Sequence, residues 1–121
     1  MLKNRNRLKS KRAFNATYKN GIITNSKSIT LYAGKKKSDN NCPTRVGFVV
    51  SKKIHKRAVK RNRIKRLMRE CIRLMLKNNN SDINKYTSLI LSARNDVLNK
   101  NYGDINKTIS FLVSSLANKN I

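Results

Sequence analysis

Acidic residues are scarce in this 121-residue sequence: five Asp and Glu residues stand against 29 Lys and Arg residues, and the formal net charge is +24. Histidine is rarer still, because His55 is the single one. Catalysis by side chains needs positioned acids, bases or metal ligands. One histidine and five widely separated carboxylates do not provide them. We therefore expect no catalytic residue, and we interpret His55 as a solvated or phosphate-contacting side chain.

The sequence also lacks the usual metal and nucleotide motifs. Cys42 and Cys71 are isolated thiols without the paired spacing of a zinc site. We interpret both as reduced and structural and expect no metal bound by the protein. A disulfide between them is the less attractive alternative, because nothing suggests export. No phosphate loop of the G-x-x-x-x-G-K-[ST] type is present.

Long hydrophobic runs are missing as well. No apolar run approaches the roughly 18 residues needed to cross a bilayer, and the N-terminus lacks the apolar region of a secretion signal. We expect a soluble, cytoplasmic protein without a membrane partner. A chain of this length normally forms one domain. Residues 1–121 are therefore predicted to be a single domain, in which the basic, aperiodic residues 1–9 form a flexible arm.

Positive charge is what the sequence has in excess, and it is unevenly distributed. Residues 1–77 hold 24 basic and two acidic residues, whereas residues 78–121 hold five basic and three acidic ones. The first part should therefore build a working surface, and the second should mainly complete the core. Between Lys52 and Lys77, twelve basic residues accompany one acid, Glu70. Such a run is usually a solvated helix face, but those faces interleave acids, so a nucleic-acid partner is favoured.

Hydrophobic periodicity predicts short elements in the first half. Ser10 is placed to cap a helix that Gly21 would follow. A strand is predicted over residues 22–33, with an interruption near residues 25–27. The run R-V-G-F-V-V-S over residues 45–51 predicts the clearest strand.

The second half contains a long amphipathic helix, predicted from Arg57 or Ala58 to about Leu76. Its apolar arc consists of Ile64, Leu67, Met68, Cys71, Ile72 and Met75, and its cationic arc of Lys65, Arg66, Arg69 and Arg73. A strand over residues 86–93 and a final helix through residues 105–116 follow. This order predicts an α+β sandwich with the helices on one sheet face. The strand, helix, strand unit would ordinarily cross over in the right-handed sense.

Phe14, Tyr18 and Tyr32 have two interpretations. Phe14 and Tyr18 lie four residues apart on one face of the first helix, and such pairs belong more often to a core than to a ligand platform. If part of the sheet face is open, the three rings would instead stack unpaired bases while nearby cations follow the nucleic-acid backbone.

The motif R-V-G-F-V-V-S-K-K followed by R-N-R-I-K-R-L-M-R-E resembles the protein subunit of bacterial ribonuclease P. The resemblance extends to R-N-R-L at residues 5–8, to the aromatic pair before Gly21, to I-T-L-Y at residues 29–32 and to L-I-L-S-A-R at residues 89–94. It implies a single α/β domain with a central mixed sheet and an unusual left-handed βαβ crossover, like ribosomal protein S5 domain 2.

The same resemblance implies a function that composition cannot reveal. In this family a catalytic RNA uses Mg2+ to cut the 5′ leader from precursor tRNA. The protein helps to bind that leader and to support the RNA fold, and it needs no obligatory protein partner. By position, the leader contacts would be Phe14, Tyr18 and Tyr32. The contacts to the catalytic RNA would be Lys52, Lys53, Arg61, Asn62, Arg63, Lys65, Arg66 and Arg69.

Three other functions stay open at this point. A ribosomal or general structured-RNA-binding protein would share the charge and the size. A DNA-binding module would insert the basic helix into a major groove. A protein-only nuclease would cut RNA without an added RNA subunit.

Overall fold

A computed structural model of the chain describes residues 6–20, 22–35, 37, 43–51, 53–54, 56–78, 83, 85–94, 97–98 and 100–119. Its elements are α1 (Lys11–Lys19), β1 (Ile22–Asn25), β2 (Ile29–Ala33), β3 (Arg45–Val49), α2 (Ala58–Lys77), β4 (Ser88–Ala93) and α4 (Tyr102–Lys119). Every element predicted from periodicity is present, and the interruption of the first predicted strand separates β1 from β2. Gly21 lies outside the described residues.

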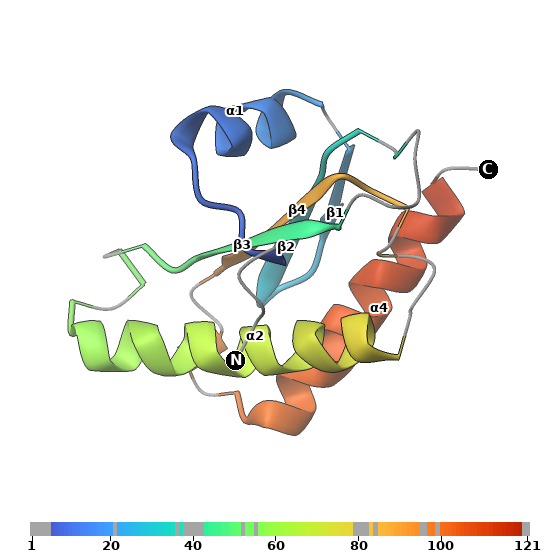
Figure 1. Cartoon of the computed structure of the whole chain (residues 1–121). Coiled ribbons are helices and arrows are strands. Elements are labelled where there is room, and N and C mark those ends of the chain that lie inside the picture. Colours follow the sequence, from blue (N-terminus) through green and yellow to red (C-terminus); the bar gives the residue numbers. More distant parts are fainter. Residues whose placement is uncertain are drawn as a thin grey trace.

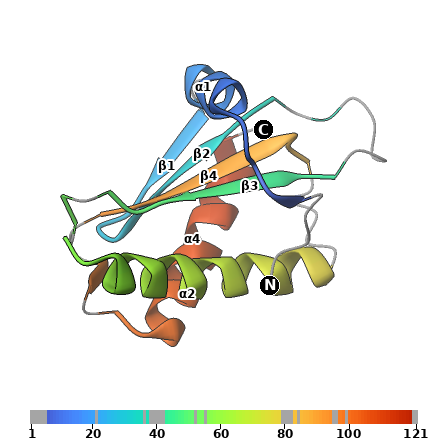
Figure 2. The same cartoon turned by 60° about the vertical axis from the view of Figure 1, so that its left-hand side comes forward.

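The four strands form one mixed sheet in the order β1-β2-β4-β3. β2 pairs antiparallel with β1 and β4, whereas β3 pairs parallel with β4 and places Val46 opposite Leu89. Seen from the face that α2 covers, with β3 and β4 pointing upward, β4 lies to the left of β3 (Figure 1 and Figure 2). The crossover through α2 is therefore left-handed. The ordinary right-handed expectation is wrong here, and the hand implied by the resemblance is confirmed.

Helices cover both faces of the sheet. Figure 2 shows α2 and α4 on one face and α1 on the other. The prediction that all helices share one face is therefore wrong for α1. Alternation along β3 explains the arrangement: Val46 and Phe48 pack toward the core under α2, while Gly47 between them faces α1. Because an apolar pair such as Phe14 and Tyr18 can pack on either face, the sequence holds no signal for the side.

The hydrophobic core lies between the sheet and the layer of α2 and α4. Buried residues from α2 are Ile64, Met68, Cys71 and Ile72. The C-terminal part completes the core, as predicted, with buried residues that include Leu89, Leu91, Ile105, Ile109, Leu112 and Leu116. Cys71 is a free, buried thiol whose pKa is raised by burial, which confirms its structural interpretation. Cys42 lies outside the described residues.

The N-terminal segment is attached to the edge strand β3. Arg7 forms a parallel bridge with Val46, and the Leu8 backbone N–H donates to the Val46 carbonyl at 3.0 Å. The Asn6 side-chain amide donates to the Thr44 carbonyl at 2.9 Å. Residues 6–8 of the predicted flexible arm are therefore attached to the sheet, and residues 1–5 lie outside the described part of the chain.

Candidate nucleic-acid interface

α1 starts at a side-chain cap and lies across the strands. As predicted, Ser10 is the N-cap, and its hydroxyl oxygen accepts a hydrogen bond from the Ala13 N–H at 3.0 Å. One turn later the Phe14 ring lies over Gly47 of β3, where an added Cβ would clash with the ring. The lack of a side chain at Gly47 is therefore what allows this close approach.

Two further contacts hold α1 on the sheet. The Thr17 and Ser88 hydroxyl oxygens lie 2.6 Å apart. Because the Thr17 hydroxyl donates to the Ala13 carbonyl at 2.9 Å, Ser88 supplies the proton of the bond between the two side chains. The ring of Tyr18 packs edge-on against that of Tyr32 of β2, with the centroids 4.7 Å apart. α1 thus contacts β3, β4 and β2 in turn.

The three aromatic residues of the predicted leader site lie outside the core. Phe14 and Tyr32 are half-buried, and Tyr18 is 38% exposed. Burial and the neighbouring Tyr32 raise the pKa of the Tyr18 hydroxyl, so this group remains a hydrogen-bond donor at neutral pH. Each ring therefore helps to fix α1 and stays partly accessible.

The polar side chains between Lys60 and Arg69 of α2 fall into three groups around the helix. Those on the flank toward β3 are partly buried and recur every four residues: Arg61, Lys65 and Arg69. Those on the outer side are exposed: Asn62 and Arg66. Those on the opposite flank, toward the segment before α4, are also exposed: Lys60 and Arg63. The single cationic arc of the sequence is therefore at least two separate surfaces.

Two arginines of the β3 flank, Arg69 and Arg61, are partly enclosed by neighbouring groups. The Arg69 guanidinium carbon lies 5.9 Å from the centroid of the Phe48 ring, a cation–π contact. The Arg61 Nε is sheltered from solvent and has no hydrogen-bond partner among the described residues. A buried donor of this kind is favourable only when an acceptor reaches it, so Arg61 suits a site that a ligand completes.

Glu70, the one acid in the basic run, forms an ion pair with Arg73. The Arg73 Nη2 lies 2.6 Å from Glu70 Oε1, and Nε lies 3.0 Å from Oε2. This bidentate contact holds the pKa of Glu70 below its usual value and raises the pKa of Arg73. The acid thus pairs with Arg73, and among the described residues no ion pair joins it to the cations of the β3 flank.

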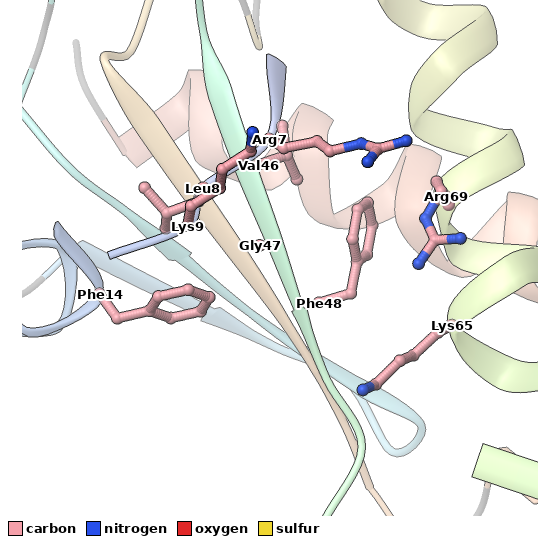
Figure 3. A pocket seen from close by; sticks show the side chains of 9 residues that line it. All are labelled: Arg7, Leu8, Lys9, Phe14, Val46, Gly47, Phe48, Lys65 and Arg69. Atoms are coloured by element: carbon pink, nitrogen blue, oxygen red, sulfur yellow. The ribbon is translucent and has the colours of Figure 1, made fainter. Parts of the chain in front are cut away.

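A pocket of about 440 Å³ opens at the β3 edge, where α1, the N-terminal segment and α2 meet. It is lined by Arg7, Leu8, Lys9, Phe14, Val46, Gly47, Phe48, Lys65 and Arg69. Figure 3 shows Arg7 extending above the Phe48 ring and Arg69 beside it, with Lys65 reaching toward β3. Four cations, two aromatic rings and no acid line this pocket. That combination suits a nucleotide, which carries a phosphate and a planar base.

The pocket joins two sets of predicted site residues. Phe14, expected at the leader, shares it with Lys65 and Arg69, which were expected at the catalytic RNA. Tyr18 and Tyr32 form their own pair farther along α1.

Other predicted residues stay apart from this pocket. Arg63 is on the opposite flank of α2, and Lys53 is exposed in the turn after β3. Lys52 and His55 lie outside the described residues.

Sequence reasoning missed Arg7, Lys9 and Phe48 as lining residues. Arg7 was part of the R-N-R-L motif, but its place beside α2 depends on the bridge to Val46. Phe48 had a usable signal, because it alternates with Gly47 and so shares a strand face with Val46.

The described residues contain no cluster of three or more His, Cys, Asp or Glu that could hold a metal. No helix in the described part of the chain is long and apolar enough to span a bilayer.

Comparison with known proteins identifies the family. The family model Ribonuclease P matches residues 2–117. The chain is 34% identical over 112 residues to the ribonuclease P protein component of Oceanobacillus iheyensis, covering 93% of this chain and 87% of that one. It is 37% identical over 106 residues to the Clostridioides difficile component, with 88% and 87% covered.

Solved structures agree with this. The Staphylococcus aureus RNase P protein aligns with a TM-score of 0.73 and 28% identity, covering 90% of this chain and 93% of that one. The Thermotoga maritima protein aligns with a TM-score of 0.69 and 21% identity over 89% and 96%, and so shares the fold. The chain therefore belongs to the family of bacterial ribonuclease P protein components.

Proposed function

We propose that this protein binds the catalytic RNA of ribonuclease P through α2 and holds the 5′ leader of precursor tRNA against α1 and the β3 edge. Membership of the family makes the chain a subunit of an endoribonuclease holoenzyme that contains an RNA subunit. In this proposal the RNA cuts the leader with Mg2+, and the protein supplies cations and stacking surfaces. The protein thus contributes by raising the affinity for the substrate and by positioning its leader.

The proposal rests on the pocket at the β3 edge, where an aromatic ring and cationic side chains lie together. Phe14 presents a half-buried ring from α1, and Lys65 and Arg69 present charge from α2. A single-stranded leader needs both, because its bases stack on aromatic rings while its phosphates require neutralisation. A folded RNA offers mainly phosphates to a protein, and these suit the other cations of α2, which are Arg61, Arg63 and Arg66.

Reconstitution with the cognate RNA tests the proposal. Precursor tRNA cleavage should be faster with the protein than without it at low Mg2+, where phosphate neutralisation by the metal is weakest. Absence of any improvement would contradict the proposal. Equal affinity for precursor and mature tRNA would favour a general RNA-binding protein, and cleavage without the RNA subunit would favour a protein-only nuclease.

Site variants separate the two proposed surfaces. Phe14→Ala should weaken binding of long-leader substrates by about 1 to 3 kcal/mol per lost stack, with little effect on mature tRNA. Phe111→Ala is the matched control, because Phe111 is 61% exposed on α4. Equal losses for precursor and mature tRNA would assign Phe14 to folding alone.

The complementary variant removes two cations of α2. Arg61→Ala combined with Arg63→Ala should weaken binding of the catalytic RNA and reduce the salt-dependence slope by about 1.4 to 1.8, the value for two phosphate contacts. An unchanged affinity and slope would remove both residues from the interface.

A further inference from the structure

A second basic pocket lies on the other side of α2. It has a volume of about 370 Å³ and is lined by Lys60, Arg63, Ile64, Leu98, Lys100 and Asn101. Lys60 and Arg63 come from the first turns of α2, whereas Lys100 and Asn101 come from the segment that leads into α4. Figure 1 shows this start of α4 close under the N-terminal half of α2. Only Arg63 among these residues was expected to bind RNA.

Three of the six lining residues are cationic, and none is acidic. The nearest described acid along the chain, Asp104, is engaged in capping α4: its backbone N–H donates to Asn101 Oδ1 at 2.9 Å, and its carboxylate accepts from the Asn101 N–H at 3.4 Å. The reciprocal cap fixes the backbone that carries Lys100. Lys100, which directly precedes this cap, is half-buried and lines the pocket beside α2.

The pocket contains no aromatic ring, which distinguishes it from the pocket at the β3 edge. Its apolar lining residues, Ile64 and Leu98, are aliphatic. A single-stranded segment would gain no stacking here. A phosphate of a folded RNA is attracted by the cationic side chains of this lining, and it needs no stacking surface because the bases are already paired.

We propose that this pocket binds a backbone phosphate of the catalytic RNA subunit, and that Lys60 and Lys100 are contact residues alongside Arg63. This inference rests on the proposed function and adds the α4 segment to the RNA interface. It also assigns different ligands to the two pockets beside α2: the pocket at the β3 edge holds the substrate leader, and the pocket toward α4 holds the catalytic RNA.

The test compares two variants with the same change in net charge. One is the full chain with Lys60→Ala and Lys100→Ala, and the control carries Lys85→Ala and Lys107→Ala, two exposed lysines outside both pockets. Binding of the full-length catalytic RNA is titrated over a range of KCl concentrations. Loss of that one phosphate contact should reduce the slope of log K against log salt by about 0.7 to 0.9, which is about 5- to 8-fold in affinity at 0.1 M salt. The control variant should change the slope and the affinity much less.

Two additional measurements make the result decisive. Lys60→Arg with Lys100→Arg should restore affinity, because the charge and the donors return. The ratio of affinities for long-leader and short-leader precursors should stay unchanged in the alanine variant, since the leader contacts the other flank. Circular dichroism of each variant should show the helix content of the parent protein.

Equal effects of the pocket and control variants would overturn the inference, as would a selective loss of long-leader affinity. If Arg66→Ala, on the outer side of α2 and in neither pocket, still weakens RNA binding in that case, the proposed function stands and only the second pocket is lost. If no α2 variant weakens RNA binding, the proposed function itself fails.

Discussion

At the scale of single residues, Gly47 determines how closely α1 approaches the sheet. A Cβ at this position would overlap the far end of the Phe14 ring and press on Leu8. The ring can move more easily than the backbone, so a larger residue would displace the aromatic surface proposed for the leader. Gly47 therefore acts on function through the position of Phe14.

Gly47→Ala should destabilise the protein by about 1 to 3 kcal/mol, as overpacking does, and lower the preference for long-leader substrates. Urea unfolding measures the first effect and substrate titration the second. In a Phe14→Ala background the same substitution should cost little, because the ring is gone. Gly103→Ala is the control: its new Cβ would meet Asn101 Oδ1 at 3.4 Å, an ordinary contact, and alanine favours the helix. Equal destabilisation at both glycines would contradict the explanation.

At the scale of elements, α1 depends on its attachments. Nine residues are too few for a stable isolated helix in water. The Ser10 cap, the Thr17 contact to Ser88 and the packing of Tyr18 on Tyr32 supply what the helix lacks. α1 should therefore be one of the first elements to open, and its stability should control the proposed leader surface.

Ser10→Ala should destabilise α1 by about 0.5 to 2 kcal/mol, because the Ala13 N–H loses its acceptor. Amide hydrogen exchange measures the result as faster exchange within α1 and unchanged exchange within α2. Ser110→Ala, at an exposed position of α4, serves as the control. Identical exchange of α1 in both variants would show that the cap contributes nothing.

The helices and strands could be predicted from the sequence, whereas the contacts between them could not. The boundaries of α2 followed from its amphipathic period, and the cap at Ser10 followed from local chemistry. The side on which α1 packs depends on Gly47 and Ser88, which lie 41 residues apart in the chain. Lys100 looked like part of a nearly neutral segment, and only the fold brings it beside Arg63. The family resemblance implied the left-handed crossover, which no local pattern encodes.

At the scale of the whole molecule, the charge of +24 opposes folding. The described residues show one carboxylate bridge on α2, between Glu70 and Arg73. The two flanks of α2 carry further cations within a short distance of each other. Screening or binding of anions should therefore stabilise the free protein.

The thermal midpoint should rise by several degrees between about 0.01 and 0.15 M NaCl, as the Debye length falls from about 30 to about 8 Å. Sulfate at equal ionic strength should raise the midpoint further if the basic pockets bind tetrahedral anions. Differential scanning calorimetry measures both effects. A midpoint that is constant or falls with salt would show that self-repulsion is unimportant.

The central position of β4 also has a consequence during protein synthesis. This strand is the last of the four to be made, yet both β2 and β3 pair with it, and the hydroxyl that anchors α1 belongs to a residue 71 positions downstream. A nascent chain therefore cannot assemble its sheet or seat its first helix until β4 has left the ribosome. Premature termination before that point would release a strongly cationic polypeptide without a native core.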